Sequence, residues 1–122
     1  SELWKKINIA VCGIGSPLIS KHSNWQGFYA DNLLESLKGE QVAGDILSRF
    51  YDINGKVLDT IISKKMISSE LDNLKNADYS IGIAESLDKV AGILGALRGK
   101  YINVLVTTEE TAEAVLKMNN KA

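Results

Sequence analysis

The sequence predicts an α/β fold with a mostly parallel sheet, and three observations support this prediction. Short, mostly apolar and β-branched runs lie at 7–12, 79–84 and 102–106, which is typical of buried parallel strands. The second and third runs are each followed by an amphipathic helical pattern, as in alternating strand–helix architectures. Asn54-Gly55 adds the signal of a β-hairpin between the first and second runs.

The N-terminal half predicts a strand, a loop, a helix and the hairpin. The strand at 7–12 ends at Gly13-Ile14-Gly15, and a loop without periodicity follows over 16–26. Apolar residues at helical spacing predict a helix over 28–38, which Gly39 ends. These apolar residues are Ala30, Leu33, Leu34 and Leu37. The hairpin strands are expected at 46–51 and 56–60.

The C-terminal half predicts three helices and two strands. A short helix is expected over 69–76, with Ser68 or Ser69 as its N-cap. The strand at 79–84 leads to a helix over 87–98, which Ser86 caps and Gly99 ends. After the strand at 102–106, Thr107 and Glu110 match a capping box that opens the last helix. The residues that share its inner face are Ala112, Val115, Leu116 and Asn119.

Composition excludes several classes of protein. The 122 residues carry 14 basic and 15 acidic side chains and no basic cluster, so this chain by itself is not expected to bind DNA or RNA. No run approaches the ~20 apolar residues that span a bilayer. One Cys excludes an intrachain disulfide and fits the reducing cytoplasm, and one Cys with one His cannot form a structural zinc site. We expect neither a metal nor a cofactor.

The chain reads as one domain without repeats, yet it contains few strands for its class. About three core strands and a hairpin are visible, whereas a doubly wound sheet usually holds about five or six. We therefore expect the chain to be part of a larger sheet.

The glycine pair Gly13-Ile14-Gly15 has three possible meanings. A dinucleotide-binding fingerprint is disfavoured, because Leu18 replaces the third glycine and Pro17 interrupts the helix start. The glycines can serve a strand-to-loop turn that needs their backbone conformations. Alternatively, the backbone of this loop, with Ser16, approaches a small ligand at the carboxyl edge of the sheet.

Two charged residues are candidates for ligand binding. The Asp45 carboxylate can accept hydrogen bonds from the hydroxyls of a sugar or from a nearby backbone N–H. Lys89 lies in the first turn of the predicted helix, where it is either a solvated lysine or a partner of an anion bound at the helix N-terminus. The side chains of Glu85 and Ser86 can accept hydrogen bonds from the same N–H groups that would bind a phosphate, which disfavours a bound phosphate.

Other residues have simpler interpretations. His22 and Trp25 share the polar loop with Ser16 and suit a ligand lid or an interface, without the spacing of a catalytic triad. Cys12 is expected in the core. Gly92 and Gly95 give their helix a small face that favours close packing.

The order of these segments resembles a known family. The segments that carry the resemblance are Gly13-Ile14-Gly15-Ser16-Pro17, Gly44-Asp45-Ile46, Phe50, Asp52, Gly55, Lys89, Ala96-Leu97-Arg98-Gly99, Tyr101 to Thr107 and Glu109 to Ala112. From Val11 to Leu116 the chain resembles the C-terminal part of the sugar-binding effector domain of SorC/DeoR-type bacterial transcriptional regulators.

The resemblance implies a fold, a function and a site. The fold is a Rossmann-like sheet similar to that of sugar-phosphate isomerases and CoA transferases. The first half of the effector domain and a helix-turn-helix DNA-binding domain lie outside this chain. The family's ligand loop corresponds to Gly13, Ile14 and Gly15, its hydroxyl-binding acid to Asp45, and its phosphate-binding lysine to Lys89.

The sequence departs from the family pattern at two places. The family usually has two glycines where this chain has Glu85 and Ser86, and an Asp where Thr108 stands. Glu85 adds negative charge near the place where an anionic effector is expected.

The resemblance predicts a non-enzymatic sensor that binds a sugar or sugar phosphate and controls DNA binding through the upstream domain, in a homo-oligomeric (dimeric or tetrameric) cytoplasmic protein. Two alternatives stay open. One is an isomerase-like enzyme that uses Asp45 or Glu85 as a base. The other is a module that serves mainly for oligomerisation.

Overall fold

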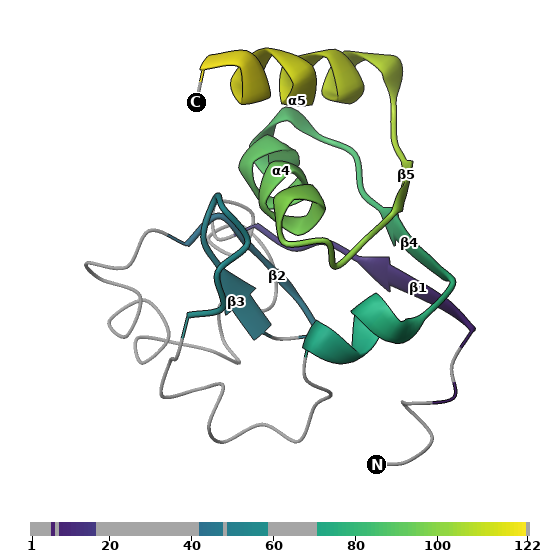
Figure 1. Cartoon of the computed structure of the whole chain (residues 1–122). Helices are drawn as coiled ribbons and strands as arrows, with labels where there is room; N and C mark the ends of the chain where they lie inside the picture. Colours follow the sequence, from purple (N-terminus) through teal and green to yellow (C-terminus); the bar gives the residue numbers. More distant parts are fainter. Residues whose placement is uncertain (1–5, 7, 17–41, 48, 59–70, 122) are drawn as a thin grey trace, which may run out of the picture.

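A parallel sheet of three strands confirms the predicted α/β class. A computed structural model describes residues 6, 8–16, 42–47, 49–58 and 71–121. Strands β1 (Ile9–Gly13), β4 (Tyr79–Ile83) and β5 (Val104–Val106) lie side by side in the order β1–β4–β5 (Figure 1). Val11 pairs with Ile81, which pairs in turn with Val104.

Several expectations lie outside the described residues. They are the helix at 28–38 with its stop Gly39, the loop from Pro17 to Gln26 with His22 and Trp25, the end of the second hairpin arm at 59–60, and the caps Ser68 and Ser69. The short helix predicted over 69–76 is described from Leu71 onward, where η2 (Leu71–Asn76) is a 3-10 helix.

Helix α4 (Val90–Arg98) follows β4 and shares one core with the inner face of the sheet. It continues directly from one 3-10 turn, η3 (Leu87–Lys89), so the helix predicted over 87–98 is confirmed. Ser86 is its cap, because the Asp88 N–H donates to the Ser86 Oγ at 3.2 Å. The buried apolar core comprises Cys12, Ile14, Ile46, Tyr51, Leu71, Leu74, Ala84, Val90, Ile93, Leu94, Ala96, Tyr101, Ile102 and Val115.

The core position predicted for Cys12 is confirmed. Cys12 is buried as a free thiol, and burial raises its pKa. A buried thiol without a neighbouring cation is an inert packing residue.

Helix α5 (Glu109–Lys121) packs against α4, and its start corrects the predicted capping box. The N–H of Thr111 donates to the Thr108 hydroxyl at 3.2 Å, so Thr108 caps the helix. The Thr107 hydroxyl is buried and has no hydrogen-bond partner among the described residues. The prediction placed the cap one residue too early, because the helix begins at Glu109 and Thr108 is the residue that directly precedes it.

The face predicted for α5 is only partly right. Thr111 and Val115 are buried, whereas Leu116 is 64% exposed. Asn119 is exposed and accepts a hydrogen bond from Arg98. The helix therefore presents to α4 a face centred about one residue earlier than the sequence pattern indicated.

The hairpin differs from the prediction in its strands. The residues expected to form one strand at 46–51 instead form two short antiparallel strands, β2 (Gly44–Ile46) and β3 (Arg49–Tyr51). The chain reverses at Leu47, whose φ of 53° is left-handed and cannot continue a strand. The predicted single strand is therefore wrong, although both halves are extended.

The turn at Asn54-Gly55 is present, and its return arm is described as far as Leu58. The Asp52 Oδ1 accepts hydrogen bonds from the N–H groups of Asn54 and Lys56, both at 2.9 Å. Gly55 has a φ of 86°, a conformation that favours glycine. Beyond it, the described part of the arm predicted at 56–60 forms an antiparallel bridge from Val57 to Tyr51, and the Leu58 N–H donates to the Phe50 carbonyl oxygen at 2.8 Å. Turn chemistry thus predicted the reversal correctly, and residues 59–60 of the predicted arm lie outside the described residues.

Small residues on α4 let the hairpin approach its backbone, as predicted for Gly92 and Gly95. A Cβ at Gly44 would lie 2.7 Å from the Gly92 Cα, and a Cβ at Gly95 would lie 2.5 Å from the Asp52 carbonyl oxygen. The Tyr51 hydroxyl donates to the Gly92 carbonyl oxygen at 2.8 Å. Helix α4 therefore lies between the hairpin and α5 (Figure 1).

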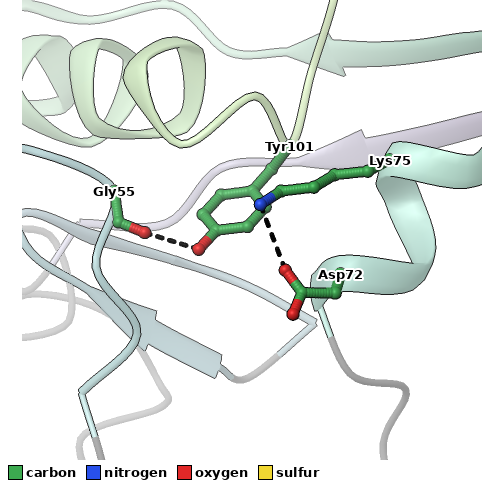
Figure 2. Close-up of polar contacts among 4 residues, drawn as sticks. All are labelled: Gly55, Asp72, Lys75 and Tyr101. Carbon is green, nitrogen blue, oxygen red and sulfur yellow. Dashed lines mark hydrogen bonds and ion pairs between the residues drawn. The ribbon is translucent and has the colours of Figure 1, made fainter.

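A second tyrosine anchors the turn to the C-terminal end of α4. The buried Tyr101 hydroxyl donates to the Gly55 carbonyl oxygen (Figure 2). The Lys75 Nζ lies 5.2 Å from the centre of the Tyr101 ring and 3.2 Å from the Asp72 carboxylate. This cluster joins η2, α4 and the turn, so the hairpin is held at two points.

Gly99 ends α4 as predicted, but its backbone is not in the left-handed conformation that usually places a glycine at a helix end. Its φ is −75°, and the left-handed residue is Lys100, with a φ of 62°. A Cβ at Gly99 would lie 2.5 Å from the Tyr101 ring and 3.0 Å from the Gly55 Cα. The glycine is therefore needed for space.

Candidate functional site

The candidate residues gather where the parallel strands end. Gly13 is the last residue of β1, and Ile14, Gly15 and Ser16 follow it. Glu85 and Ser86 follow β4, and this is the edge at which open α/β sheets bind ligands. The structure brings both segments together, because the Ser16 hydroxyl donates to the Asp88 carbonyl oxygen at 2.8 Å.

Asp45 reaches this edge from the hairpin. Its backbone forms an antiparallel bridge with Gly15, in which each N–H donates to the other residue's carbonyl oxygen at N···O distances of 2.9 Å and 3.2 Å. Its carboxylate covers the Cα of Gly15, since a Cβ there would lie 2.1 Å from the Asp45 Oδ1. Neither Gly13 nor Gly15 has a positive φ. Gly15 is therefore required because the Asp45 carboxylate lies so close to its Cα. The alternative considered from the sequence, a turn that needs a glycine backbone conformation, is not supported.

The Asp45 carboxylate is a half-buried and partly desolvated acceptor. Burial raises the pKa of Asp45, and the positive charge of Lys89 opposes part of this shift. In the described ranges no backbone N–H donates to the carboxylate, although such a bond was one of the two roles considered for it. Its remaining capacity suits a hydroxyl donor from outside the protein.

Lys89 stands at the junction of η3 and α4, and its side chain is half-buried. Its charge acts on Asp45, so the two charged candidates lie within electrostatic reach of each other. Together with Gly15 they form a constellation of one carboxylate, one ammonium and a backbone without a side chain. Such a set can bind a polyhydroxylated ligand at one end and an anionic group at the other.

Ser86 has an unusual backbone. Its φ is 142°, a region that non-glycine residues rarely adopt. Its N–H donates to the Thr111 hydroxyl at 3.2 Å, while its own hydroxyl accepts from Asp88. Ser86 therefore serves the helix cap, and Glu85 beside it is exposed. The hydrogen bonds to Asp88 and Thr111 hold Ser86 in a backbone conformation that a glycine would adopt without strain.

Ile14 and Gly13 contribute to the edge only through their backbone. The Ile14 side chain is 1% exposed and lies in the core, next to the positions that a Cβ on Gly82 or Gly92 would take. Gly13 has open space around its Cα, with nothing within 4 Å of a Cβ placed there.

Two hydroxyl residues were not identified from the sequence. Tyr51 anchors β3 to α4, and burial and the negative charge of Asp45 raise its pKa far above the usual range, so it stays a neutral donor. Thr111 is buried and links α5 to Ser86. The sequence signal that could have identified Thr111 is its spacing, because it lies three residues after Thr108, the cap of the same helix.

The described residues contain neither a candidate metal site nor a candidate membrane-spanning helix. Among residues 6, 8–16, 42–47, 49–58 and 71–121, no three His, Cys, Asp or Glu side chains gather as metal ligands. In the same part of the chain, no helix combines the length and apolar character that crossing a bilayer requires.

Comparisons with known proteins show the family of the chain. Residues 1–117 match the family described as "Putative sugar-binding domain". The chain belongs to this sugar-binding domain family. A similar protein is the sorbitol operon regulator of Klebsiella pneumoniae, 52% identical over 117 residues. The deoxyribonucleoside regulator of Bacillus subtilis is 36% identical over 115 residues.

A solved structure supports both the fold and the family. The full-length sorbitol operon regulator SorC from K. pneumoniae superposes with a TM-score of 0.87 at 51% identity, covering 94% of this chain. The resemblance to SorC/DeoR-type regulators is thus confirmed. This sugar-binding domain chain spans only 37% of the sorbitol operon regulator and 36% of the deoxyribonucleoside regulator.

Replacement of Asp45 by Asn tests the electrostatic description of this site. The folded chain binds the Asp45 proton more tightly than the unfolded chain, so ionised Asp45 destabilises the fold above its folded pKa. This cost disappears as the pH falls below the ordinary value of 3.8. Asp45→Asn should therefore raise the melting temperature at pH 7 and lose that advantage near pH 3.5, as followed by circular dichroism. An equal gain at both pH values would contradict the assignment.

Replacement of Ser86 by Gly tests the strain at the α4 cap. Glycine removes a backbone cost of about 1–3 kcal/mol and forfeits a cap hydrogen bond whose loss to glycine costs only a few tenths. Urea unfolding should show a net gain of about 1 kcal/mol. Ser86→Ala is the control, because it loses the cap while keeping the strain, and it should be destabilised. If both variants lose stability equally, the backbone of Ser86 is not strained.

Proposed function

We propose that this chain is the ligand-sensing part of a cytoplasmic transcriptional regulator and that it binds a sugar or a sugar phosphate. The observation that carries the proposal is the Asp45 carboxylate, which lies over Gly15, is partly desolvated, and has the Lys89 charge nearby. A partly desolvated acceptor to which no described residue donates gains free energy when a ligand hydroxyl supplies a donor.

The regulatory step requires only differential affinity. A ligand that binds one arrangement of the protein more tightly than another shifts the population between them. In this proposal the arrangements differ in their affinity for DNA, which a helix-turn-helix domain of the same polypeptide contacts. The near-neutral charge of this chain fits that division of roles. The full-length protein acts as a homo-oligomer, in which such a shift can be shared between subunits.

An isomerase is the second candidate, since burial raises the pKa of Asp45 in the direction that a general base requires. The names of the similar proteins favour regulation, because they are described as regulators. The titratable group that acts on Asp45 from the same edge is Lys89, to which we assign an anionic end of the ligand rather than a proton transfer. We therefore propose a binding module without turnover, in which oligomerisation serves the sensing.

The test uses the full-length regulator and a panel of ligands. Pentoses, hexitols, deoxyribonucleosides and their phosphate esters are titrated by calorimetry and by thermal shift. The hexitols and deoxyribonucleosides are included because two relatives are named for sorbitol and deoxyribonucleosides. A ligand should raise the melting temperature and change operator affinity in a gel-shift assay without being consumed. The sensor proposal fails if no member of the panel binds at millimolar concentration.

Lys89→Gln should reveal whether the ligand is phosphorylated. Loss of one ammonium–phosphate contact costs about 1.5–3 kcal/mol, or roughly 10- to 100-fold in Kd. The loss should be confined to the phosphate esters of the panel, with the free sugars bound as before. Lys117→Gln on the exposed surface of α5 is the matched control and should bind like the parent. Equal losses for free and phosphorylated sugars would show that Lys89 does not contact a phosphate.

A further inference from the structure

Thr111 is a buried hydroxyl residue of α5 that reaches the turn between β4 and η3. Its exposed fraction is 2%, whereas the other polar residues of α5 are exposed. The Thr111 Oγ1 accepts one hydrogen bond from the Ser86 N–H at 3.2 Å and another from the Thr108 hydroxyl at 2.8 Å. Thr111 and Ser86 lie 25 positions apart along the chain, so the first of these bonds joins α5 to a separate element of the fold.

The backbone of Ser86 depends on such bonds because its conformation is unfavourable. Its φ of 142° and ψ of 144° lie in a region that is rare for residues other than glycine. A residue in this region keeps its conformation only when the surrounding structure holds it there. Thr111 accepts from the Ser86 N–H, and the Asp88 N–H donates to the Ser86 hydroxyl. Ser86 is therefore held from two sides, by α5 and by η3.

The turn that Ser86 opens carries Lys89, one of the two charged candidates for ligand binding. The Lys89 N–H donates to the Ser86 carbonyl oxygen at 3.0 Å, so the Ser86 backbone fixes where η3 begins and where Lys89 stands. In the same turn the Asp88 carbonyl oxygen accepts from the Ser16 hydroxyl at 2.8 Å, which joins the turn to the loop after β1. A shift of the Ser86 backbone would therefore displace Lys89 and disturb this link.

Helix α5 does not need the Thr111 hydroxyl for its own cap. The capping oxygen is the Thr108 Oγ1, which accepts the backbone N–H of Thr111 at 3.2 Å. This bond uses the main chain of Thr111, so it remains when the side-chain oxygen is removed. Substitution of the side chain can therefore separate the contact with Ser86 from the start of the helix.

We infer that Thr111 is a positioning residue of the ligand site: its hydroxyl holds the strained Ser86 turn in the arrangement that places Lys89 at the carboxyl edge of the sheet. Thr111 acts through Ser86 and is not assigned a contact with the ligand. The inference rests on the proposed function for the use of the site, whereas the positioning itself can be measured without a ligand.

Hydrogen exchange of the full-length regulator tests whether Thr111 holds the turn. Thr111→Val keeps the shape of the side chain and removes its oxygen. The amides of Ser86, Asp88 and Lys89 should then exchange at least about 10-fold faster, because their hydrogen bonds depend on the Ser86 conformation, whereas the amides of β5 should exchange as in the parent. Thr111→Ser restores the oxygen and should restore the protection. An unchanged rate in the turn, or an equal acceleration in β5, would overturn the inference.

Two further variants separate positioning from general stability. Thr108→Val removes the α5 cap and leaves the Thr111 hydroxyl, so it should lower the melting temperature without freeing the turn. Ser86→Gly removes the strain, so adding Thr111→Val to it should change the exchange of the Lys89 amide by less than about 2-fold. If Thr111→Val accelerates this amide equally with serine and with glycine at position 86, Thr111 does not oppose strain and the inference is wrong.

Titration of sorbitol 6-phosphate connects the turn to ligand binding. This ester is chosen because a similar protein is a sorbitol operon regulator, and its phosphate is the group that Lys89 would bind. Thr111→Val should weaken its binding roughly 10-fold and leave the binding of sorbitol within about 2-fold, while Thr111→Ser should bind like the parent. Equal binding of the ester by the parent and by Thr111→Val would overturn the inference. A parent that binds no member of the panel would instead overturn the proposed function, and the exchange rates would then decide the role of Thr111.

Discussion

Gly15→Ala should remove most of the ligand affinity of the full-length regulator and leave its fold intact. The new Cβ would lie 2.1 Å from the Asp45 Oδ1, so one of the two groups must move. The carboxylate is the end of a rotatable side chain, whereas Gly15 is held by two backbone hydrogen bonds to Asp45. The carboxylate should therefore rotate away from its position beside the ligand.

The size of this loss follows from the bond that disappears. A hydrogen bond to a charged group contributes about 1.5–3 kcal/mol, which corresponds to roughly 10- to 100-fold in Kd. Calorimetric titration measures the affinity, and circular dichroism with thermal melting checks the fold. Asp45→Asn combined with Gly15→Ala should bind no more weakly than Asp45→Asn alone, because both changes act on the same carboxylate.

Gly13→Ala is the matched control for Gly15→Ala. Both glycines belong to the same loop, but nothing lies within 4 Å of a Cβ placed on Gly13. Alanine at position 13 should therefore leave both the affinity and the melting temperature close to those of the parent. If the two variants lose affinity equally, the loop binds ligand through its glycines in general, and the placement of the Asp45 carboxylate is not the reason.

Gly95→Ala should cost about 2 kcal/mol of stability, although alanine in an exposed helix normally adds about 1 kcal/mol. The Cβ would lie 2.5 Å from the Asp52 carbonyl oxygen and 2.9 Å from the Tyr51 ring. The carbonyl belongs to the backbone of the turn, so the hairpin and α4 must separate. Because the hairpin also carries Asp45, the same variant should bind ligand more weakly.

Gly92→Ala provides the graded comparison on the same helix. Its Cβ would meet the nearest atoms at 3.2 Å, which requires a shift of only a few tenths of an ångström. Urea unfolding of the two variants should therefore rank Gly95→Ala as the less stable. The reverse order, or a gain of stability at position 95, would show that the hairpin does not pack on α4 in the way described.

The strands and helices of the sheet were predictable because their signals are local. The apolar run that forms β4 and the stripe that forms α4 are contiguous, and Ser86 caps the helix where the pattern indicates. The errors arose where the chain turns. Leu47 reverses the chain without a glycine, and Thr108 takes the cap from Thr107, so no residue type announced either event.

The candidate site was predictable only as a set of residue types. Gly15, Asp45 and Lys89 were selected by the order of motifs and the family resemblance, and the structure brings the three together. The sequence could not show that Gly15 leaves room for a carboxylate, because that contact joins residues 30 positions apart along the chain. Tyr51 was missed for the same reason, since its hydroxyl bonds to a residue 41 positions away.

By itself, the sequence determined the α/β class, the order of the described strands and helices, and the chemical types at the carboxyl edge. It also determined the near-neutral charge of 14 basic and 15 acidic residues. Only the tertiary structure decided which glycines are needed for space and which hydroxyls hold the hairpin. The physical reason is range: propensity and periodicity act over a few neighbouring residues, whereas close packing and desolvation depend on side chains that meet only when the chain has folded.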